Sequence, residues 1–409
     1  MFGKRIISLS VAAACWICSS AQRYPNDGMY RYSLDFTVTL AGIGTTAEEF
    51  VDSIDIIAED GQIYVPVYIK GHRHLFNLDT GSSQGVFYAG ERLQYNKVVG
   101  KVNSRDANGH IDTIPAVEFP DFYLGRLRIS GYKGSLLRRP PGHYRYDGII
   151  GFDLINRGLN AKIDIQARKL IITDRRDYFD NEPGHTLRYR LRRFVPYIAL
   201  KPFGKHTEQF LIDLGSKDLL AINKAFFNRE RQKDSNLNLF VEEETTGQRM
   251  IGSYGNECHG SIIYLRLPKI RWNDDFTFTD VHTATTQGDS RIGARLLNYG
   301  TLVFNPQRKS VTFQPYANVP ELTPDMDTKD IYYVRTADGR PMVGSVRQNS
   351  LPYSRGFRQG DTILSINGTN IATLADLQGY PFVKGRRYVF RLRTPQGSNK
   401  EVVVEQWGF

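Results

Sequence analysis

Residues 75–83 read Leu-Phe-Asn-Leu-Asp-Thr-Gly-Ser-Ser, an apolar stretch that runs into Asp79 and then into small, turn-forming residues. A second stretch, Phe-Leu-Ile-Asp-Leu-Gly-Ser at 210–216, repeats this order around Asp213. A strand that ends in a tight turn explains either copy alone, because Gly, Asp and Ser are common turn residues. Two copies in one chain predict a pair of equivalent strand–turn units.

The sequence that follows each copy also repeats. Asp79 is followed 72 positions later by Gly151, within Gly-Ile-Ile-Gly, and Asp213 is followed 80 positions later by Gly293, within Ser-Arg-Ile-Gly. Further apolar runs come after each glycine. Two units with the same order of parts at similar spacing indicate an internal repeat.

The repeated unit resembles the retropepsin-like and pepsin-like aspartic peptidases, in which each lobe carries an Asp-Thr/Ser-Gly turn and, much later, an apolar-apolar-Gly segment beneath it. This resemblance implies a mainly β fold with two β-barrel lobes, at 60–185 and 186–320. It also implies hydrolysis of a peptide or protein substrate by an activated water, with no metal and no cofactor. Two neighbouring carboxylates share one proton, so one acts as base on the water while the other polarises the carbonyl.

The resemblance assigns roles residue by residue. Asp79 and Asp213 would be the catalytic carboxylates. Ser82 would bond to the outer oxygen of Asp79, and Thr80 would interlock the two loops across the pseudo-twofold axis. The residues expected to support the site are therefore Thr80, Gly81, Ser82, Gly215 and Ser216.

The second unit departs from the family pattern. Leu214 replaces the hydroxyl residue, so half of the interlock is not expected, and Arg291 precedes Ile292-Gly293. Three versions stay open. Asp79 pairs with Asp213 in one chain, Asp79 meets its own copy in a homodimer, or the site binds peptides without cutting them. The prediction is an aspartic-type endopeptidase, monomeric or homodimeric, and the alternative is a non-catalytic peptide-binding or scaffolding protein.

The resemblance also implies that at least one lobe carries a hairpin over the cleft. In the first lobe the expected hairpin is 103–114, with Ala-Asn-Gly at its tip. In the second lobe the turns at 245–248 and 252–256 are the candidates. Such hairpins exclude water and hold an extended substrate.

The C-terminal section, 328–409, reads as a separate α+β unit. It follows a polar, proline-containing linker. Residues 360–368, Gly-Asp-Thr-Ile-Leu-Ser-Ile-Asn-Gly, resemble the PDZ domains of bacterial envelope proteases, and Asn-Gly is a strong hairpin signal. PDZ domains add an extended peptide to a sheet edge. A C-terminal peptide ligand and a purely bracing role both remain open, because 337–341 lacks an apolar-Gly signature.

The N-terminus reads as an export signal. Lys4 and Arg5 precede a mostly apolar run at 6–18 and small residues at 19–21, which predicts a signal peptide over 1–21 and an extension over 22–59. The expected location is periplasmic or extracellular, soluble or envelope-associated, with a lipoprotein signal at Cys15 as the alternative.

Composition narrows the remaining functions. Aromatic residues make up 12% of the chain, and many short runs of Val, Ile, Tyr and Phe favour strands. One such strand, 62–69, contains Pro66, which predicts an edge position or a bulge. The net charge is +10, and the basic stretch 188–194 is interpreted as a strand with one solvated face, without nucleic-acid binding. No ligand spacing typical of a zinc site is present in the sequence.

Overall fold

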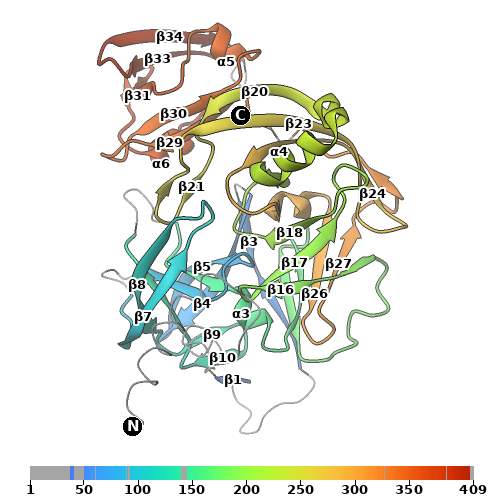
Figure 1. The fold of residues 1–409 in the computed structure, drawn as a ribbon. Coiled ribbons are helices and arrows are strands. Elements are labelled where there is room, and N and C mark those ends of the chain that lie inside the picture. Colours follow the sequence, from blue (N-terminus) through green and yellow to red (C-terminus); the bar gives the residue numbers. More distant parts are fainter. Residues whose placement is uncertain are drawn as a thin grey trace, which may run out of the picture.

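The protein is built mainly from β-strands, which confirms the predicted mainly β class (Figure 1). The computed structural model describes residues 37–40, 50–59, 61–88, 90, 93–139, 145–326, 328–383 and 385–405. The predicted signal peptide at 1–21 lies outside the described residues. No helix in the described ranges is long and apolar enough to cross a membrane.

The first half of the chain forms a curled sheet that carries Asp79 at the end of one strand. Among the described residues this sheet has eleven strands, in the order β1 (Thr37–Leu40), β10 (Leu127–Ser130), β9 (Phe122–Leu124), β4 (Gln62–Ile69), β5 (His72–Asp79), β12 (Gly148–Gly151), β6 (Gly85–Tyr88), β11 (Lys133–Leu137), β8 (Ile111–Glu118) and β7 (Lys97–Arg105), with β3 (Ile57–Glu59) beside β4. The short helix α3 (Phe152–Ile155) follows β12 directly.

The second half forms a related sheet around Asp213. In the described part of the chain its nine strands are β16 (Arg190–Arg192), β17 (Val195–Leu200), β18 (Glu208–Asp213), β25 (Arg291–Gly293), β19 (Leu220–Asn223), β24 (Thr277–Thr286), β23 (Gly260–Arg271) and β20 (Val241–Gly247), with β28 (Glu321–Leu322) beside β24. Around it lie helix α4 (Lys224–Lys233), the 3-10 turns η1 (Ser235–Phe240) and η2 (Ala294–Asn298), and a small hairpin of β21 (Ile251–Gly252) and β22 (Gly255–Asn256).

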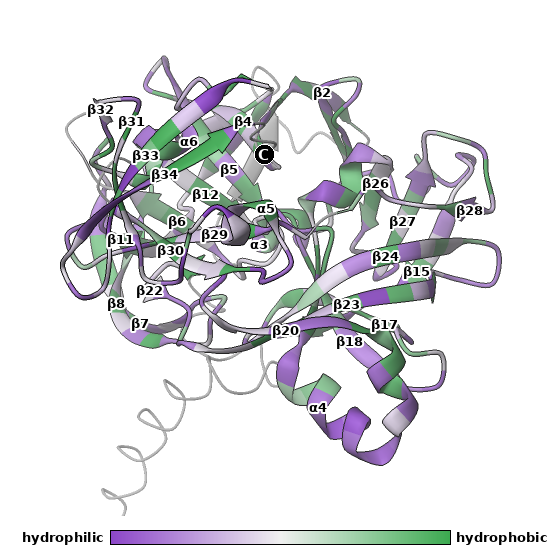
Figure 2. Ribbon diagram, turned by 90° about the horizontal axis from the view of Figure 1, so that it is seen from above, coloured by the Kyte–Doolittle hydropathy of each residue, from purple (hydrophilic) through white to green (hydrophobic). Residues whose placement is uncertain are grey.

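A third sheet joins the two halves. Its order is β15 (His185–Arg188), β27 (Ser310–Pro315), β26 (Gly300–Asn305), β13 (Asn160–Asp164), β14 (Lys169–Thr173) and β2 (Val51–Asp55). Strand β13 from the first half pairs with β26 from the second, and β2 comes from the segment expected to be an extension. One continuous hydrophobic core therefore runs through both halves. In Figure 2 hydrophobic residues concentrate on sheet strands such as β4, whereas α4 at the rim is largely hydrophilic.

The C-terminal unit (residues 328–405) has its own sheet and its own core. The sheet order is β29 (Ile331–Arg335), β30 (Pro341–Val346), β31 (Thr362–Ile366), β33 (Arg387–Arg393) and β34 (Asn399–Glu405), with β32 (Thr369–Asn370) beside β31 and the helices α5 (Leu351–Ser354) and α6 (Leu374–Gln378). Asn367 and Gly368 both have positive φ, 47° and 81°, in the turn between β31 and β32. This is the backbone that the Asn-Gly pair predicts.

Two local expectations have different outcomes. Strand β4 lies between β9 and β5, so it is not an edge strand of the sheet, but Pro66 itself pairs on one side only, with Leu75 of β5. The proline is tolerated because β3 pairs only with 62–64 and β9 only with 68–69, which leaves the Pro66 side open. The basic stretch 188–194 is not the single strand that was predicted, because Arg188 ends β15 of the third sheet and Arg190 begins β16 of the second-half sheet. Arg188, Arg190 and Arg192 are nevertheless exposed, and Tyr189 is buried.

Candidate active site

Asp79 and Asp213 occupy equivalent positions at the ends of two strands. Strand β5 pairs in parallel with β12, and Asp79 lies opposite Gly151. Strand β18 pairs in parallel with β25 in the same way, and Asp213 lies opposite Gly293. The glycine at the end of each second strand is needed because the loop after the aspartate packs onto it. The repeat seen in the sequence is therefore a repeat of backbone geometry.

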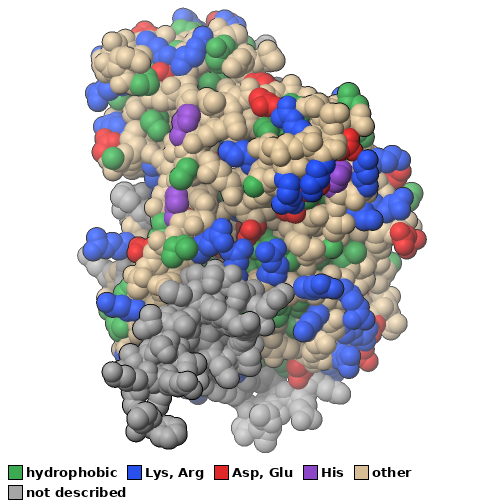
Figure 3. All heavy atoms as spheres, viewed as in Figure 1, with side chains coloured by type: hydrophobic (Ala, Val, Ile, Leu, Met, Phe, Trp, Pro, Cys, Tyr) green, Lys and Arg blue, Asp and Glu red, His purple; other side chains and the backbone are tan. Residues whose placement is uncertain are grey.

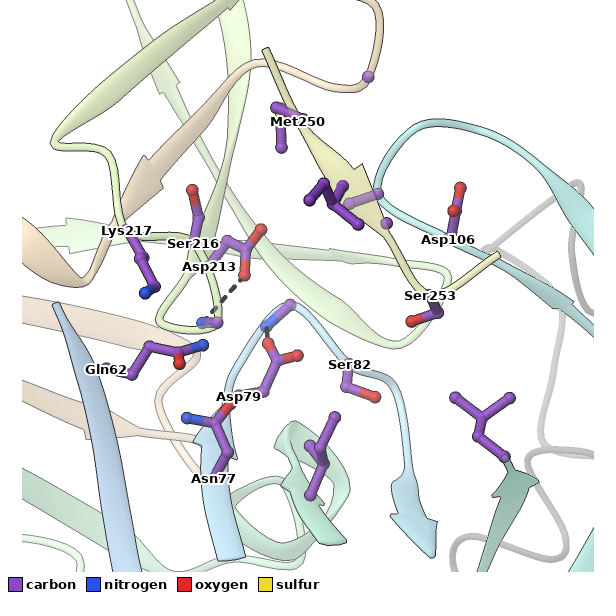
Figure 4. A pocket seen from close by; sticks show the side chains of 18 of the residues that line it. Gln62, Asn77, Asp79, Ser82, Asp106, Asp213, Ser216, Lys217, Met250 and Ser253 are labelled. Atoms are coloured by element: carbon purple, nitrogen blue, oxygen red, sulfur yellow. Dashed lines mark hydrogen bonds between the residues drawn. The ribbon is translucent and has the colours of Figure 1, made fainter. Parts of the chain in front are cut away.

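Each aspartate is touched by the glycine of the other loop. A Cβ added at Gly81 would lie 2.4 Å from Oδ1 of Asp213, and one added at Gly215 would lie 2.5 Å from Cγ of Asp79. Each glycine also donates its own N–H to the aspartate of its own loop, at 2.8 Å for Gly81 and 3.1 Å for Gly215. The structure thus brings Asp79, Asp213 and both glycines together, and only glycine permits so close an approach. Figure 4 shows the two carboxylates on adjacent loops with these two bonds.

The contact between the loops is one-sided. The fully buried Thr80 hydroxyl donates to the carbonyl of Ile212 at 2.7 Å and accepts from the N–H of Leu214 at 3.0 Å. Leu214 is also fully buried, but its side chain has no polar atom to return the bond. Thr80 therefore makes half of the expected interlock, and apolar packing of Leu214 replaces the other half.

The two serines bind differently from the expectation. The Ser82 hydroxyl donates to the carbonyl of Gln84 at 2.7 Å and not to the outer oxygen of Asp79. The backbone instead shows the symmetry, because Ser82 N–H donates to the carbonyl of Asp79 and Ser216 N–H donates to the carbonyl of Asp213. Ser82 and Ser216 are thus part of the loops mainly through their main chain.

Burial in the cleft and the neighbouring charge of Asp213 raise the pKa of Asp79 to about 8. The N–H groups of Gly81 and Ser82 act in the opposite direction with smaller effect. A carboxyl with this pKa is mostly protonated at neutral pH.

Arg291 is a site residue whose role the sequence reasoning missed. Its guanidinium is 2% exposed, and Nη1 lies 3.3 Å from Oδ2 of Asp213. Arg291 occupies the strand position that Ile149 holds in the first half, two residues before the glycine. The signal in the sequence was an arginine at the position where the first unit has the apolar Ile149. Among the two aspartates, Arg291 forms its ion pair with Asp213.

Both aspartates line a cleft of about 950 Å³. In Figure 4 Asp79 and Asp213 lie on its floor, while Met250 and Ser253 lie on the opposite side. The opposite side comes from two hairpins, β7–β8 in the first half and β21–β22 in the second. These are the segments that the sequence analysis expected at 103–114 and 252–256. The third expected turn, 245–248, begins inside strand β20.

The two hairpins meet above the cleft. The carboxylate of Asp106 accepts from the N–H of Tyr254 at 3.2 Å, and the Asn108 amide donates to the carbonyl of Gly255 at 3.3 Å. Arg291 reaches the same place, because its Nη2 donates to the carbonyl of Ala107 at 3.0 Å. One buried arginine therefore connects Asp213 to the hairpin that covers it.

The C-terminal unit is braced against the second half. The N–H of Gln248 donates to the carbonyl of Gly344 at 2.9 Å, Arg249 lies over the ring of Tyr332 at 4.8 Å, and Arg347 pairs with Glu243 at 3.2 Å. In Figure 1 the unit lies beside β20 and above the β7–β8 hairpin. Its residues Arg335, Leu374, Ala375, Gln378 and Gly379 line the same cleft as the two aspartates.

Comparison with known proteins adds little to this geometry. No family model matches the chain, and no curated protein matches it. Among solved structures the chain is similar to basic 7S globulin from soybean, at 10% sequence identity and a TM-score of 0.40, over 65% of this chain and 95% of the globulin chain. A likeness at this level carries no argument about function, so the functional argument rests on the site.

Proposed function

We propose that the protein is an exported aspartic-type endopeptidase in which Asp79 and Asp213 of one chain form the catalytic pair. The observation that carries this proposal is the reciprocal contact of each carboxylate with the glycine of the other loop. This contact holds two carboxylates together in a cleft, where their like charges favour sharing one proton. Export rests on the sequence of residues 1–21 alone.

The charges around the pair suggest which carboxyl holds the proton. The pKa of Asp79 is raised to about 8 by burial and by Asp213, whereas Asp213 has the guanidinium of Arg291 at 3.3 Å. In the proposed reaction ionised Asp213 removes a proton from a water, and the resulting oxygen attacks the peptide carbonyl carbon. Asp79 gives its proton to the carbonyl oxygen as the tetrahedral intermediate forms. The two carboxyls exchange protonation states, and no covalent bond to the protein is needed.

The shape of the cleft agrees with an extended peptide as the substrate. The two hairpins meet above the aspartates and would limit the access of bulk water to a bound chain. Opening these contacts would admit the substrate, and closing them would hold it against the carboxylates. A folded protein domain is too thick for this arrangement, so unfolded or loop segments are the expected targets.

A second candidate function is peptide binding without cleavage on the same fold. The observations that favour it are Leu214, which removes one half of the loop interlock, and Arg291, whose charge pairs with Asp213. A carboxylate held strongly in an ion pair is a weaker base. The cleft would then bind an extended chain and release it unchanged.

Cleavage of an unstructured peptide library separates these two functions. The protein spanning 22–409 is incubated with the library from acidic to neutral pH, beside the Asp79→Asn variant, and products are read by mass spectrometry. We expect internal cleavage that disappears in Asp79→Asn. A folded wild-type protein that cuts nothing at any pH, yet binds library peptides, would support the second function.

A further inference from the structure

The C-terminal unit provides part of the lining of the cleft. Strand β29 is an edge strand, because its only partner within the described sheet is β30. Its last residue, Arg335, lines the cleft together with residues of α6. Helix α6 is fixed by a capping box, in which the Thr373 hydroxyl accepts from the N–H of Asp376 and the Asp376 carboxylate accepts from the N–H of Thr373. A substrate that extends away from Asp79 on this side therefore meets the C-terminal unit.

Arg335 differs from the other arginines that line the cleft. Arg145 pairs with Glu59 at 2.5 Å, Arg193 pairs with Asp289, and Arg291 pairs with Asp213. Arg105 and Arg138 are exposed to solvent. Arg335 is partly buried, and within the described ranges no carboxylate forms an ion pair with it. Burial lowers the pKa of its guanidinium below the usual value, so its environment favours a negative partner.

The surroundings of Arg335 are neutral phenols. Its electrostatic neighbours are Tyr146 and Tyr88, which both line the cleft and whose rings lie 5.8 Å apart. Burial raises the pKa of Tyr88 to about 12, so this phenol stays uncharged at neutral pH. Tyr88 is also in electrostatic range of Asp79 and of Arg335 at once. Arg335 and the two tyrosines therefore line the same cleft as Asp79, and Tyr88 interacts with both the carboxyl and the guanidinium.

The main chain of Arg335 is held in place from the hairpin side. The Asn256 amide donates to the carbonyl of Arg335 at 2.6 Å and accepts from its N–H at 3.2 Å. These two bonds occupy the edge of β29 at this residue as a neighbouring strand would. Asn256 belongs to β22. The hairpin that covers the aspartates therefore also fixes the backbone from which the Arg335 side chain extends. A guanidinium on a fixed backbone loses little freedom when it binds an anion.

We propose that Arg335 determines substrate specificity by binding a carboxylate of the peptide, a few residues from the bond that is cut. A guanidinium matches a carboxylate with two parallel hydrogen bonds, which a phosphate-free peptide offers at only two places. One is an Asp or Glu side chain, and the other is the C-terminal carboxylate. This inference rests on the proposed peptidase function for its meaning, but the binding that it predicts is measurable without cleavage.

The test measures peptide binding in the Asp79→Asn background, where cleavage is not expected. An unstructured peptide carries one Glu that is moved residue by residue, beside the same peptides with Gln, and each is made with a free and an amidated C-terminus. Affinity is read by fluorescence anisotropy. We expect a carboxylate at one position to tighten binding about tenfold, as a charged hydrogen-bonded pair typically does. The Glu series and the free-acid series show which source supplies the carboxylate.

Two further variants decide whether Arg335 is responsible for the preference for a carboxylate. Arg335→Gln should remove the tenfold difference by weakening only the carboxylate peptide, with the Gln-amide peptide unchanged. The matched control is Arg391→Gln, an exposed arginine on β33 of the same unit, which should keep the difference. A preference that survives in Arg335→Gln, or no preference in the parent protein, would overturn the proposal. Carboxylate preference without any wild-type cleavage would overturn the peptidase function and leave the role of Arg335 standing.

Discussion

The loops around Asp79 and Asp213 share a backbone and differ in two side chains. Both end a strand opposite a glycine, and both press a second glycine against the other carboxylate. The first loop has Thr80 where the second has Leu214. The strand beneath the first loop has Ile149 where the one beneath the second has Arg291.

This difference teaches how a repeated unit acquires two roles. The backbone contacts require glycine and allow almost no variation, because any added Cβ collides with a carboxylate. The side chains next to these backbone contacts can differ between the two halves, and with them the charge and the hydrogen bonds around each aspartate. Burial and the neighbouring charge of Asp213 raise the pKa of Asp79 to about 8, while Asp213 has the guanidinium of Arg291 beside it.

Replacing Arg291, the buried cation, should have the largest effect on the difference between the two halves. Arg291→Ile gives the second half the residue type that Ile149 provides in the first. Loss of one partner leaves the buried Asp213 without its ion pair, and such losses typically cost about 3–5 kcal/mol of unfolding free energy. Urea denaturation measures this change. Ile149→Val is the matched control and should cost about 1 kcal/mol. An Arg291→Ile protein as stable as the wild type would mean that the ion pair is not formed.

Adding a methyl group at the loop glycines should break the shared backbone. Gly81→Ala forces the Asp213 carboxylate to move, and Gly215→Ala does the same to Asp79. A displacement of about 1 Å in a catalytic group can cost roughly a hundredfold in rate. Peptide cleavage rates measure the effect. Gly90→Ala, where an added Cβ meets nothing within 4 Å, serves as the control. Equal rates in all three variants would contradict the reciprocal contact.

The one-sided interlock predicts that the Thr80 hydroxyl contributes to stability. Thr80→Val leaves the buried N–H of Leu214 and the carbonyl of Ile212 without their partner, which costs about 1–3 kcal/mol. Thr80→Ser keeps the hydroxyl and should lose less. Thermal or urea unfolding of Thr80→Val beside Thr80→Ser measures the difference. If the two variants are equally stable, the hydroxyl bonds contribute nothing and the interlock is only a packing contact.

The raised pKa of Asp79 also predicts a slope of stability with pH. The folded protein keeps the Asp79 proton up to about pH 8, whereas the unfolded chain releases it near pH 4. This contribution to stability is full below pH 4 and is lost as pH rises to about 8. Asp79→Asn, which cannot ionise, should remove that decline. Denaturation curves at several pH values test this, with the exposed Asp112→Asn as control; a decline that persists in Asp79→Asn would refute the assignment.

The sequence could predict the parts of the site that depend on the backbone. The sequence identifies Asp79, Gly81, Asp213 and Gly215, because the close approach of the two loops requires a glycine two residues after each aspartate. Thr80 can be identified for a similar reason, since its hydroxyl forms hydrogen bonds with the nearest part of the other loop. The mainly β class followed from short aromatic and β-branched runs, and Asn367-Gly368 specified its own turn.

The remaining features of the fold and the site depend on which segments, far apart in the sequence, meet in the folded protein. Arg291 is 78 residues from Asp213 in the chain, and only the register of β18 with β25 places it there. Asn256 and Arg335 come from different units, so their pairing follows from how the C-terminal unit docks. The Ser82 hydroxyl donates to the Gln84 carbonyl, a partner that depends on the loop geometry. Pro66 has the open side that a proline needs, but that this side is a gap between β3 and β9 in an internal strand is a property of the whole sheet.

The most direct test of the central claim compares Asp79→Asn with Asp213→Asn in the same cleavage assay. If both carboxylates of one chain act on the same water, each substitution should lower the cleavage rate by about 10²–10⁴-fold, with the variants still folded. Mixing the two variants should restore nothing, because neither chain holds a complete pair. Cleavage near the wild-type rate by Asp213→Asn, with none by Asp79→Asn, would contradict the account and assign the pair to Asp79 of two chains.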